Sequence, residues 1–295
     1  MKATLLASAR AELGECALWC ERRSALFWTD IEGRTVNRWR EADASVRQWT
    51  LPERCGSFAL CERTEQLLLG LASGIALFNL DTDAMTPVIP VEADNPVTRL
   101  NDGRCDVQGR FVFGTFNQAK DAAAIGHFYR VGADLRVERL PLPAVAVANS
   151  IAFSPDGRLM YFTDSWSREI WCVDYHADGR LGTPRLFVRI PKSEGFPDGS
   201  AVDAEGGLWN AQWAGGCVVR YAPDGSATLR VPLPASQVTC PAFGGAGLDR
   251  LFVTTARAGL DDAQLRAQPT AGDVFEVPVA SRGLPEHRFR TDLRA

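Results

Sequence analysis

The sequence predicts an all-β protein, a six-bladed β-propeller that uses residues 1–295 as a single domain. Stretches with the 3.6-residue period of a helix are almost absent, and the clearest candidate covers only residues 261–266. Instead, one unit recurs six times: a strand that ends in small or polar residues, a turn, and a second strand. Successive copies start roughly 41 to 49 residues apart, which is the spacing of four-stranded propeller blades. The copies start at Leu26, Leu67, Phe111, Met160, Leu208 and Leu251.

These units account for the chain in order. Their strand pairs are residues 26–30 and 36–39, 67–70 and 75–78, 111–115 and 126–129, 160–164 and 170–173, 208–211 and 217–221, and 251–255 and 273–277. Turn signals at residues 154–157, 204–207 and 222–225 fit tight connections between the strands of a blade. One strand, residues 4–8, is left over at the N-terminus. We expect it to pair with the last blade near residues 287–290, because that would close the ring and remove its open edges.

Composition argues against several classes of partner. The net charge is −4 and no run of Lys or Arg could follow a phosphate backbone, so no nucleic-acid partner is expected. No stretch of 18 consecutive apolar residues is present, which argues against a membrane-spanning helix. Arg10 and Glu12 interrupt the apolar N-terminus too early for a signal peptide, so we expect a cytoplasmic protein. No long apolar tract indicates an obligate protein partner.

Cysteine and histidine usage limits the kinds of metal site. None of the eight cysteines forms a Cys-x-x-Cys pair, and most lie in or beside apolar runs. Free, buried thiols are therefore favoured over disulfides or a thiolate metal site. The histidines, His127, His176 and His287, are widely spaced and offer little for a zinc site. Any metal in this protein would be held mostly by oxygen.

Polar residues at the ends of inner strands are the candidate functional residues, because the inner strands of a propeller converge on its axis. Four segments that precede a strand pair carry such residues, namely 12–15, 98–103, 147–150 and 195–199. Each also has a structural interpretation: a solvated carboxylate at Glu15, a hairpin turn at residues 101–103, a capping amide at Asn149, and a plain turn at Asp198. Together, Glu15, Asn149 and Asp198 form an oxygen set suited to calcium, magnesium or manganese. Two carboxylates would also offset most of the charge of a divalent ion.

The motifs around these residues match a known family. They are residues 13–19 (LGECALW) followed by 27–31 (FWTDI), 99–106 (RLNDGRCD), 149–157 (NSIAFSPDG), 197–209 (PDGSAVDAEGGLW) and 242–245 (AFGG). In their order and spacing, over residues 6–277, they resemble the regucalcin / senescence-marker-protein / gluconolactonase family of six-bladed propellers. Each motif is modest alone, but their order and spacing hold over nearly the full chain.

The resemblance implies a site for one divalent metal ion and a sugar lactone. The metal ligands it implies are Glu15, Asn149 and Asp198, with Asn101 close by. It also implies that Arg99 and Asn101 hold the hydroxyls and the ring-oxygen side of the lactone. Where some relatives carry an acidic substrate-contacting residue, this chain has the neutral amide Gln118. We take Gln118 as a third substrate-binding candidate, and the identity of the sugar is not carried over.

The function we expect is metal-dependent hydrolysis of an aldonolactone to the aldonic acid, a carboxylic ester hydrolysis in carbohydrate catabolism. The metal would act as a Lewis acid on the lactone carbonyl, and Asp198 is our candidate general base for the attacking water. A hydroxide held by the metal is the alternative nucleophile. The metal could be Ca, Zn, Mn or Fe(II), since geometry and availability decide more than ligand identity. We expect a five- or six-carbon sugar lactone.

Two other functions stay open from the sequence. The first is a non-catalytic regulatory propeller that binds a divalent metal or a sugar without turnover, and the second is a protein-interaction scaffold. Four aromatic residues bear on substrate binding, because they could cover the C–H face of a sugar or could instead be core between blades. They are Phe116, Trp166, Phe196 and Trp213.

Overall fold

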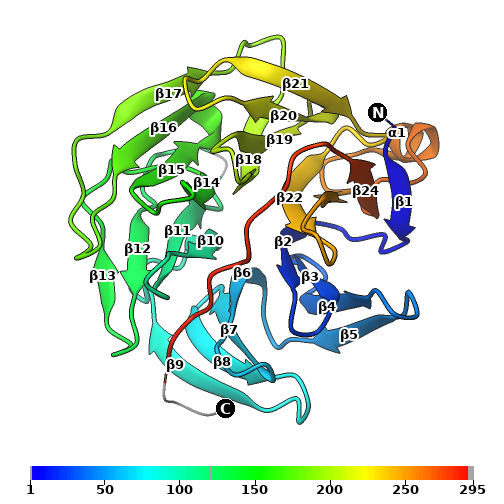
Figure 1. Cartoon of the computed structure of the whole chain (residues 1–295). Coiled ribbons are helices and arrows are strands. Elements are labelled where there is room, and N and C mark those ends of the chain that lie inside the picture. Colours follow the sequence, from blue (N-terminus) through cyan, green and yellow to red (C-terminus); the bar gives the residue numbers. More distant parts are fainter. Residues whose placement is uncertain (1, 120, 292–295) are drawn as a thin grey trace.

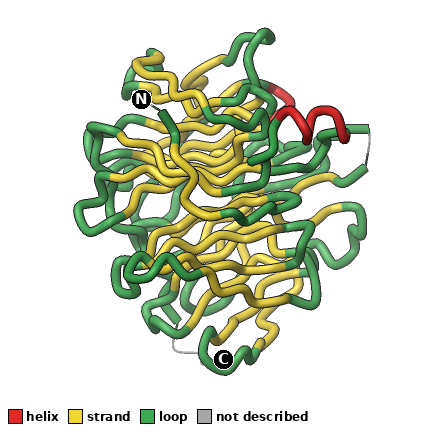
Figure 2. Tube along the Cα trace, turned by 90° about the vertical axis from the view of Figure 1, so that its right-hand side faces the viewer, coloured by secondary structure: helices red, strands yellow, loops and turns green. Residues whose placement is uncertain are grey.

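Six four-stranded sheets surround a common axis in the computed structural model of the protein, which describes residues 2–119 and 121–291 (Figure 1). We call each sheet a blade and number the blades one to six in chain order. The predicted six-bladed β-propeller is confirmed. In the view turned by 90°, the strands make up the body of the ring and the loops project from it (Figure 2).

The first three blades each use four consecutive strands. Blade one contains β2 (Gly14–Cys20), β3 (Ala25–Asp30), β4 (Thr35–Arg40) and β5 (Val46–Thr50). Blade two contains β6 (Cys55–Leu60), β7 (Gln66–Leu71), β8 (Gly74–Asn79) and β9 (Met85–Pro90). Blade three contains β10 (Thr98–Cys105), β11 (Phe111–Asn117), β12 (Phe128–Val131) and β13 (Val137–Arg139).

Blades four and five repeat this pattern, and blade six combines both ends of the chain. Blade four contains β14 (Ala148–Phe153), β15 (Leu159–Asp164), the 3-10 helix η1 (Ser165–Ser167), β16 (Glu169–Asp174) and β17 (Arg185–Arg189). Blade five contains β18 (Phe196–Val202), β19 (Leu208–Trp213), β20 (Cys217–Tyr221) and β21 (Ala227–Pro232). Blade six contains β22 (Val238–Gly244), β23 (Arg250–Thr255), β24 (Val274–Pro278) and β1 (Thr4–Ala7), and α1 (Asp262–Ala267) lies between β23 and β24.

The strand pairs predicted from the sequence are the second and third strands of each blade, β3 and β4 in blade one and their equivalents elsewhere. The predicted helix is α1. Its N-cap, Asp261, accepts a hydrogen bond from the backbone of Gln264, and the Gln264 side chain returns one to the backbone of Asp261. This capping box satisfies two of the donors that a helix leaves unpaired at its first turn.

The N-terminal strand closes the ring by pairing with the last blade, as predicted, but the partner residues predicted there, 287–290, are wrong. β1 pairs antiparallel with β24, where Thr4 lies opposite Glu276 and Leu5 opposite Phe275. Residues 287–290 lie elsewhere: Phe289 forms a parallel bridge with Cys61 of blade two. The physical reason is that β24 has an edge free for β1, whereas Phe289 is fully buried between blades two and three.

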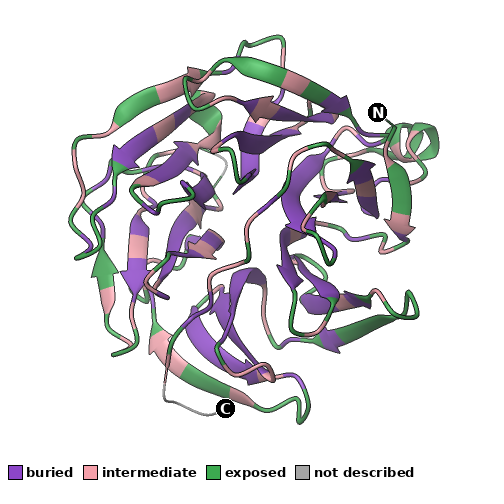
Figure 3. Ribbon diagram, in the orientation of Figure 1, coloured by how far each residue is buried: buried purple, intermediate pink, exposed green. Residues whose placement is uncertain are grey.

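The hydrophobic core is divided into six clusters, and each cluster lies between two neighbouring blades. The cluster between blades one and six contains Trp19, Trp28 and Phe252, for example. Burial is concentrated in the inner strands, and the outermost strands face solvent (Figure 3). Because packing joins the blades side by side, the inner ends of the sheets around the axis are left for polar residues.

The C-terminal segment, residues 279–291, leaves blade six and crosses the face of the ring (Figure 1). There Arg104 Nη1 donates to Glu286 Oε1 at 2.6 Å, and both side chains are nearly buried. The backbone N–H of Phe289 donates to Leu60 O, and that of Arg290 donates to Gly109 O. The segment thus contacts the C-terminal ends of the inner strands.

Two further expectations can be compared with the structure. All eight cysteines are free and buried, as predicted. Among the described residues, no helix combines the length and hydropathy needed to cross a bilayer.

Candidate active site

A cavity of about 460 Å³ opens at the N-terminal ends of the inner strands. Every blade except blade two contributes to it. Its lining consists of Leu13, Glu15, Glu32, Arg99, Asn101, Phe116, Val147, Asn149, Ser165, Trp166, Phe196, Asp198, Trp213 and Ala258. Five of the six predicted site residues, Glu15, Arg99, Asn101, Asn149 and Asp198, therefore lie in one cavity, although they are up to 183 residues apart in sequence (198 − 15).

A β-bulge places each polar residue of the cavity floor. The register with the second strand of the blade shifts between Glu15 and Leu18, between Leu100 and Gly103, between Asn149 and Ala152, and between Pro197 and Ser200. A bulge bends its strand and redirects side chains. Blades two and six carry the equivalent irregularity at Gly56 and Thr239. Every inner strand thus has the same β-bulge. In four of the strands it turns a polar side chain toward the axis, namely Glu15, Asn101, Asn149 or Asp198.

The carboxyl groups of Glu15 and Asp198 face each other in this floor. Burial is the main cause that raises the pKa of each, and the nearby charge of Asp102 raises both further. Asp198 is only 5% exposed, and its Oδ1 has no hydrogen-bond partner within the described part of the chain. Two acids side by side, one of them buried and the other partly buried, are costly to ionise together unless a positive charge joins them.

The amide of Asn149 is oriented by its neighbours. Its Nδ2 donates to Ser165 Oγ at 2.9 Å, and Ser165 Oγ in turn donates to Pro197 O at 2.7 Å. Asn149 Oδ1 accepts from Asn101 Nδ2 at 3.1 Å, which leaves the oxygen one further lone pair. Sequence reasoning missed Ser165. It follows a strand in the 3-10 turn η1, and no pattern in the sequence distinguishes it from other turn serines.

Arg99 forms the basic side of the cavity. Its Nη1 donates to Leu100 O at 2.8 Å and to Asn101 Oδ1 at 2.7 Å, and its guanidinium lies 4.7 Å from the centre of the Phe116 ring. Burial lowers the pKa of Arg99 to about 10, so the group is still protonated at neutral pH. Among the described residues of the lining, it is the only base.

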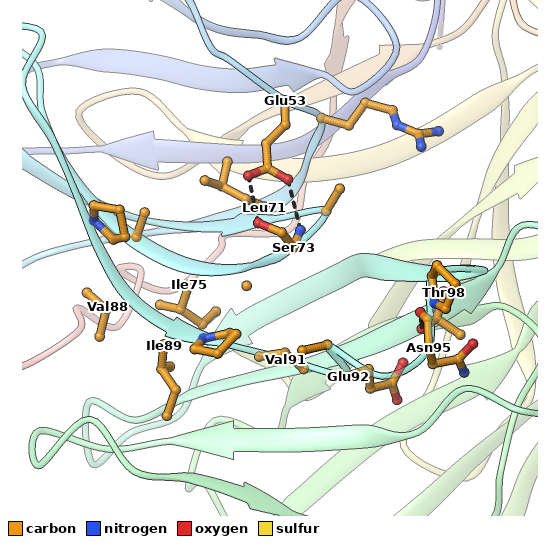
Figure 4. A pocket seen from close by; sticks show the side chains of 18 of the residues that line it. Glu53, Leu71, Ser73, Ile75, Val88, Ile89, Val91, Glu92, Asn95 and Thr98 are labelled. Atoms are coloured by element: carbon orange, nitrogen blue, oxygen red, sulfur yellow. Dashed lines mark hydrogen bonds between the residues drawn. The ribbon is translucent and has the colours of Figure 1, made fainter.

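Gln118, the remaining predicted substrate contact, does not line this cavity. It lines a neighbouring one of about 590 Å³ (Figure 4), where Glu53 accepts hydrogen bonds from the backbone and hydroxyl of Ser73. The chain turns away after β11 because Asn117 binds the following loop: its Nδ2 donates to Asp121 Oδ1 and to Ala123 O. Gln118 and Arg99 therefore line different cavities.

The four aromatic residues considered from the sequence all line the cavity, and we call them its aromatic wall. None of them belongs to the clusters between blades, so the alternative that they are interblade core is wrong. Trp166 and Phe196 meet edge to face with ring centres 5.2 Å apart. Trp166 is 56% exposed and lies at the mouth. An apolar wall opposite an oxygen-rich floor suits a ligand with one polar and one C–H face.

The residues of the floor fit a hard divalent cation. Two carboxylates and an amide oxygen are the ligands that calcium, magnesium and manganese prefer. The unpartnered Oδ1 of Asp198 and the free lone pair of Asn149 Oδ1 are available acceptors, and a cation would relieve the repulsion between the two acids. Within the described ranges, no group of three or more Cys, His, Asp or Glu side chains could hold a metal ion. A site here depends on the amide.

Comparison with known proteins identifies the family. A family model described as the SMP-30/gluconolactonase/LRE-like region matches residues 13–257. The chain belongs to the SMP-30/gluconolactonase family. It is 50% identical over 289 residues to the L-arabinolactonase of Azospirillum brasilense, covering 98% of this chain and 95% of the relative.

Other family members are more distant but equally complete. The chain is 36% identical to the 6-deoxy-6-sulfogluconolactonase of Pseudomonas putida, over 94% of each protein. The crystal structure of a calcium-binding protein, regucalcin, from Agrobacterium tumefaciens superposes with a TM-score of 0.93. It shares 32% identity and covers 98% of this chain and 97% of that one. The family therefore includes relatives named for neutral lactones, for a sulfonated lactone and for calcium binding.

Proposed function

We propose that this protein is a metal-dependent lactonase that hydrolyses a sugar lactone to the corresponding aldonic acid. The observation that carries the proposal is the convergence of Glu15, Asn149 and Asp198 on the floor of one cavity, beneath an aromatic wall. The 50% identity with an L-arabinolactonase, over nearly the full length of both chains, supports a five-carbon lactone as the first substrate to test.

Glu15, Asn149 and Asp198 would hold the metal. When bound, a divalent ion supplies Lewis acidity toward the lactone carbonyl. Calcium fits the all-oxygen ligand set, and the regucalcin neighbour is described as a calcium-binding protein. Zinc, manganese and iron(II) are the other candidates. The hydrogen bonds from Asn101 and to Ser165 would keep the oxygen of Asn149 turned toward the ion.

Asp198 is the proposed general base. As the oxygen of a water molecule attacks the carbonyl carbon, a carboxylate oxygen of Asp198 takes a proton from that water. The bond between the carbonyl carbon and the ring oxygen then breaks, and the proton passes to the leaving ring oxygen. One lactone and one water thus give one hydroxy acid. The unpartnered Oδ1 of Asp198 is the atom available for this transfer.

Arg99 and the aromatic wall would hold the sugar. The guanidinium of Arg99 has donors beyond the Nη1 that its neighbours occupy, and Nε has no partner within the described residues. It can therefore donate to lactone oxygens, while Phe116 and Phe196 cover the C–H face and exclude water. Asn101 would act mainly by orienting Asn149 and Arg99, since its Oδ1 and Nδ2 already bind them. Gln118 stays a predicted contact.

An acid-release assay over a panel of aldonolactones, with and without chelator, tests the proposal. We expect hydrolysis of a pentonolactone by the metal-loaded protein and loss of that activity with chelator. Asp198→Asn should lower kcat by about a thousandfold, the effect of removing a general base, while the circular dichroism spectrum is unchanged. Asp224→Asn, which changes an exposed turn carboxylate, is the matched control and should keep wild-type activity.

A second candidate, a metal-binding propeller without turnover, is favoured by the calcium-binding name of the regucalcin neighbour. In that case the protein would bind calcium through the same residues and release no acid from any lactone of the panel. Full activity of Asp198→Asn would instead remove the assignment of the general base.

A further inference from the structure

One charged residue of the cavity has no part in the proposed chemistry. Glu32 lies in the turn between β3 and β4, and its side chain lines the cavity while 40% of it is exposed. The other two acids of the lining, Glu15 and Asp198, belong to the floor. Glu32 therefore presents a carboxylate at the mouth, where the part of a bound sugar remote from the reacting carbonyl would lie.

The turn that carries Glu32 is rigid. The carboxylate of Asp30 accepts hydrogen bonds from the backbone N–H groups of Glu12, Leu13 and Gly33 at 2.9–3.0 Å. A Cβ at position 33 would lie 2.5 Å from Asp30 Oδ2, so this arrangement requires Gly33. Asp30 thus ties the turn to the segment that leads into β2, and the backbone of Glu32 is held in place before any ligand arrives.

Two arginines lie near Glu32, and one of them, Arg54, pairs with it. Arg54 Nη1 lies 3.4 Å from Glu32 Oε1, and Arg99 uses its Nη1 for Leu100 and Asn101 while it stacks on Phe116. The charge of Glu32 also favours the protonated form of Arg99. Among the described residues, the mouth therefore has a carboxylate whose charge is only partly offset by a half-buried arginine, Arg54, in an ion pair that water still reaches.

We propose that Glu32 is a specificity-determining residue that selects lactones whose far end is uncharged. A carboxylate at this place accepts hydrogen bonds from the hydroxyls of a neutral sugar and repels a sulfonate, phosphate or carboxylate. The substrate class is then neutral aldonolactones. This inference depends on the proposed function. A relative at 36% identity is named for 6-deoxy-6-sulfogluconolactone, so the family includes a member named for a lactone with a charged far end.

The test compares two lactones that differ only at C6: gluconolactone, with a hydroxyl, and 6-deoxy-6-sulfogluconolactone, with a sulfonate. Each is measured as a competitor of pentonolactone hydrolysis by the metal-loaded protein, so that neither needs to be turned over. For the wild type we expect the neutral compound to inhibit at least about tenfold more tightly, and we expect rising salt to reduce the ratio because exposed charges are screened.

Two variants change the charge and leave the fold intact, because Glu32 is exposed. Glu32→Gln should lower the neutral-to-anionic ratio about tenfold, and Glu32→Lys should lower it further and bring it below one. The matched control is Glu62→Gln, a similarly exposed acid that pairs with Arg22 at 3.1 Å and lines no part of this cavity. Its ratio should equal that of the wild type.

Three results would overturn the inference: a wild-type ratio near one, a ratio that Glu32→Gln and Glu32→Lys leave unchanged, or failure of both compounds to compete while the pentonolactone is hydrolysed. The last would show that rejection does not depend on charge. A protein that hydrolyses no lactone at all would instead contradict the proposed function, so the two failures are distinguishable.

Discussion

Ser165, which orients the amide of Asn149, shows that this site also depends on a residue that no motif would select. The sequence supplied Glu15, Asn149 and Asp198 because polar residues at strand ends are unusual, and the structure brings them into one cavity. It could not supply Ser165, whose role exists only because the turn after β15 returns to Asn149 and Pro197. Gln118 was selected through the family resemblance, and the side-chain bonds of Asn117 direct that part of the chain elsewhere.

The role of Ser165 gives a prediction at this scale. Ser165→Ala removes the hydrogen bond that orients the Asn149 amide, so affinity for the divalent ion should fall by about tenfold or more, as for other outer-shell partners. The measurement is a calorimetric titration of chelator-treated protein with calcium or manganese. Ser167→Ala is the control, since Ser167 lies in the same short helix and bonds only the local backbone. Equal affinities for the two variants would contradict the prediction.

At the scale of the element, the β-bulge of each inner strand is the feature that directs polar side chains into the cavity. The spacing of strands predicted which segments pair, because the second and third strands of a blade are short strand-like runs bounded by turn residues. It did not predict the bulges. Residues 101–103, interpreted as a possible hairpin turn, lie within β10, and their polar character reflects a bulge and not a chain reversal.

Gly199 tests the role of the bulge. A Cβ at this position would lie 2.8 Å from Thr239 O and 3.0 Å from Cys240 Cβ, so Gly199→Ala must push β18 away from β22. We expect a loss of roughly 1–3 kcal/mol in the free energy of unfolding, as for other overpacked sites. Metal affinity should also fall because Asp198 moves with the strand. Denaturant unfolding and metal titration measure the two effects.

The control for that variant is Gly132→Ala, where the nearest atom to a new Cβ is 3.4 Å away and φ is not positive. It should leave metal affinity unchanged. If Gly199→Ala bound the ion as tightly as the control, the close approach of β18 and β22 would not be what positions Asp198.

At the scale of the whole molecule, β1 completes the ring and residues 279–291 cross one face of it, and the sequence predicted only the first of these. Closure by the N-terminal strand follows from the need to cover an open edge. The path of residues 279–291 could not be read from the sequence, because it depends on a pocket for Phe289 between blades two and three and on the Arg104–Glu286 pair. This segment contacts the ends of the inner strands opposite to those that carry the site.

The Arg104–Glu286 pair gives a prediction at this scale. Glu286→Gln leaves Arg104 nearly buried without its counter-charge, which should lower the free energy of unfolding by roughly 3 kcal/mol. Asp174→Asn breaks an ion pair in which about half of each side chain is exposed, so it should cost at most about 1 kcal/mol. Denaturant unfolding of both variants measures the difference. A Glu286→Gln variant as stable as Asp174→Asn would show that the crossing segment is not held by this pair.

The central claim is that Glu15, Asn149 and Asp198 form one metal site that lactone hydrolysis requires. The most direct measurement is the titration of chelator-treated protein with a divalent ion while acid release from a pentonolactone is followed. We predict that activity returns in proportion to bound metal and saturates at one ion per chain. Glu15→Gln should shift this titration at least about a hundredfold toward weaker binding. Undiminished hydrolysis by the metal-free protein, or a Glu15→Gln titration identical to that of the wild type, would contradict the claim.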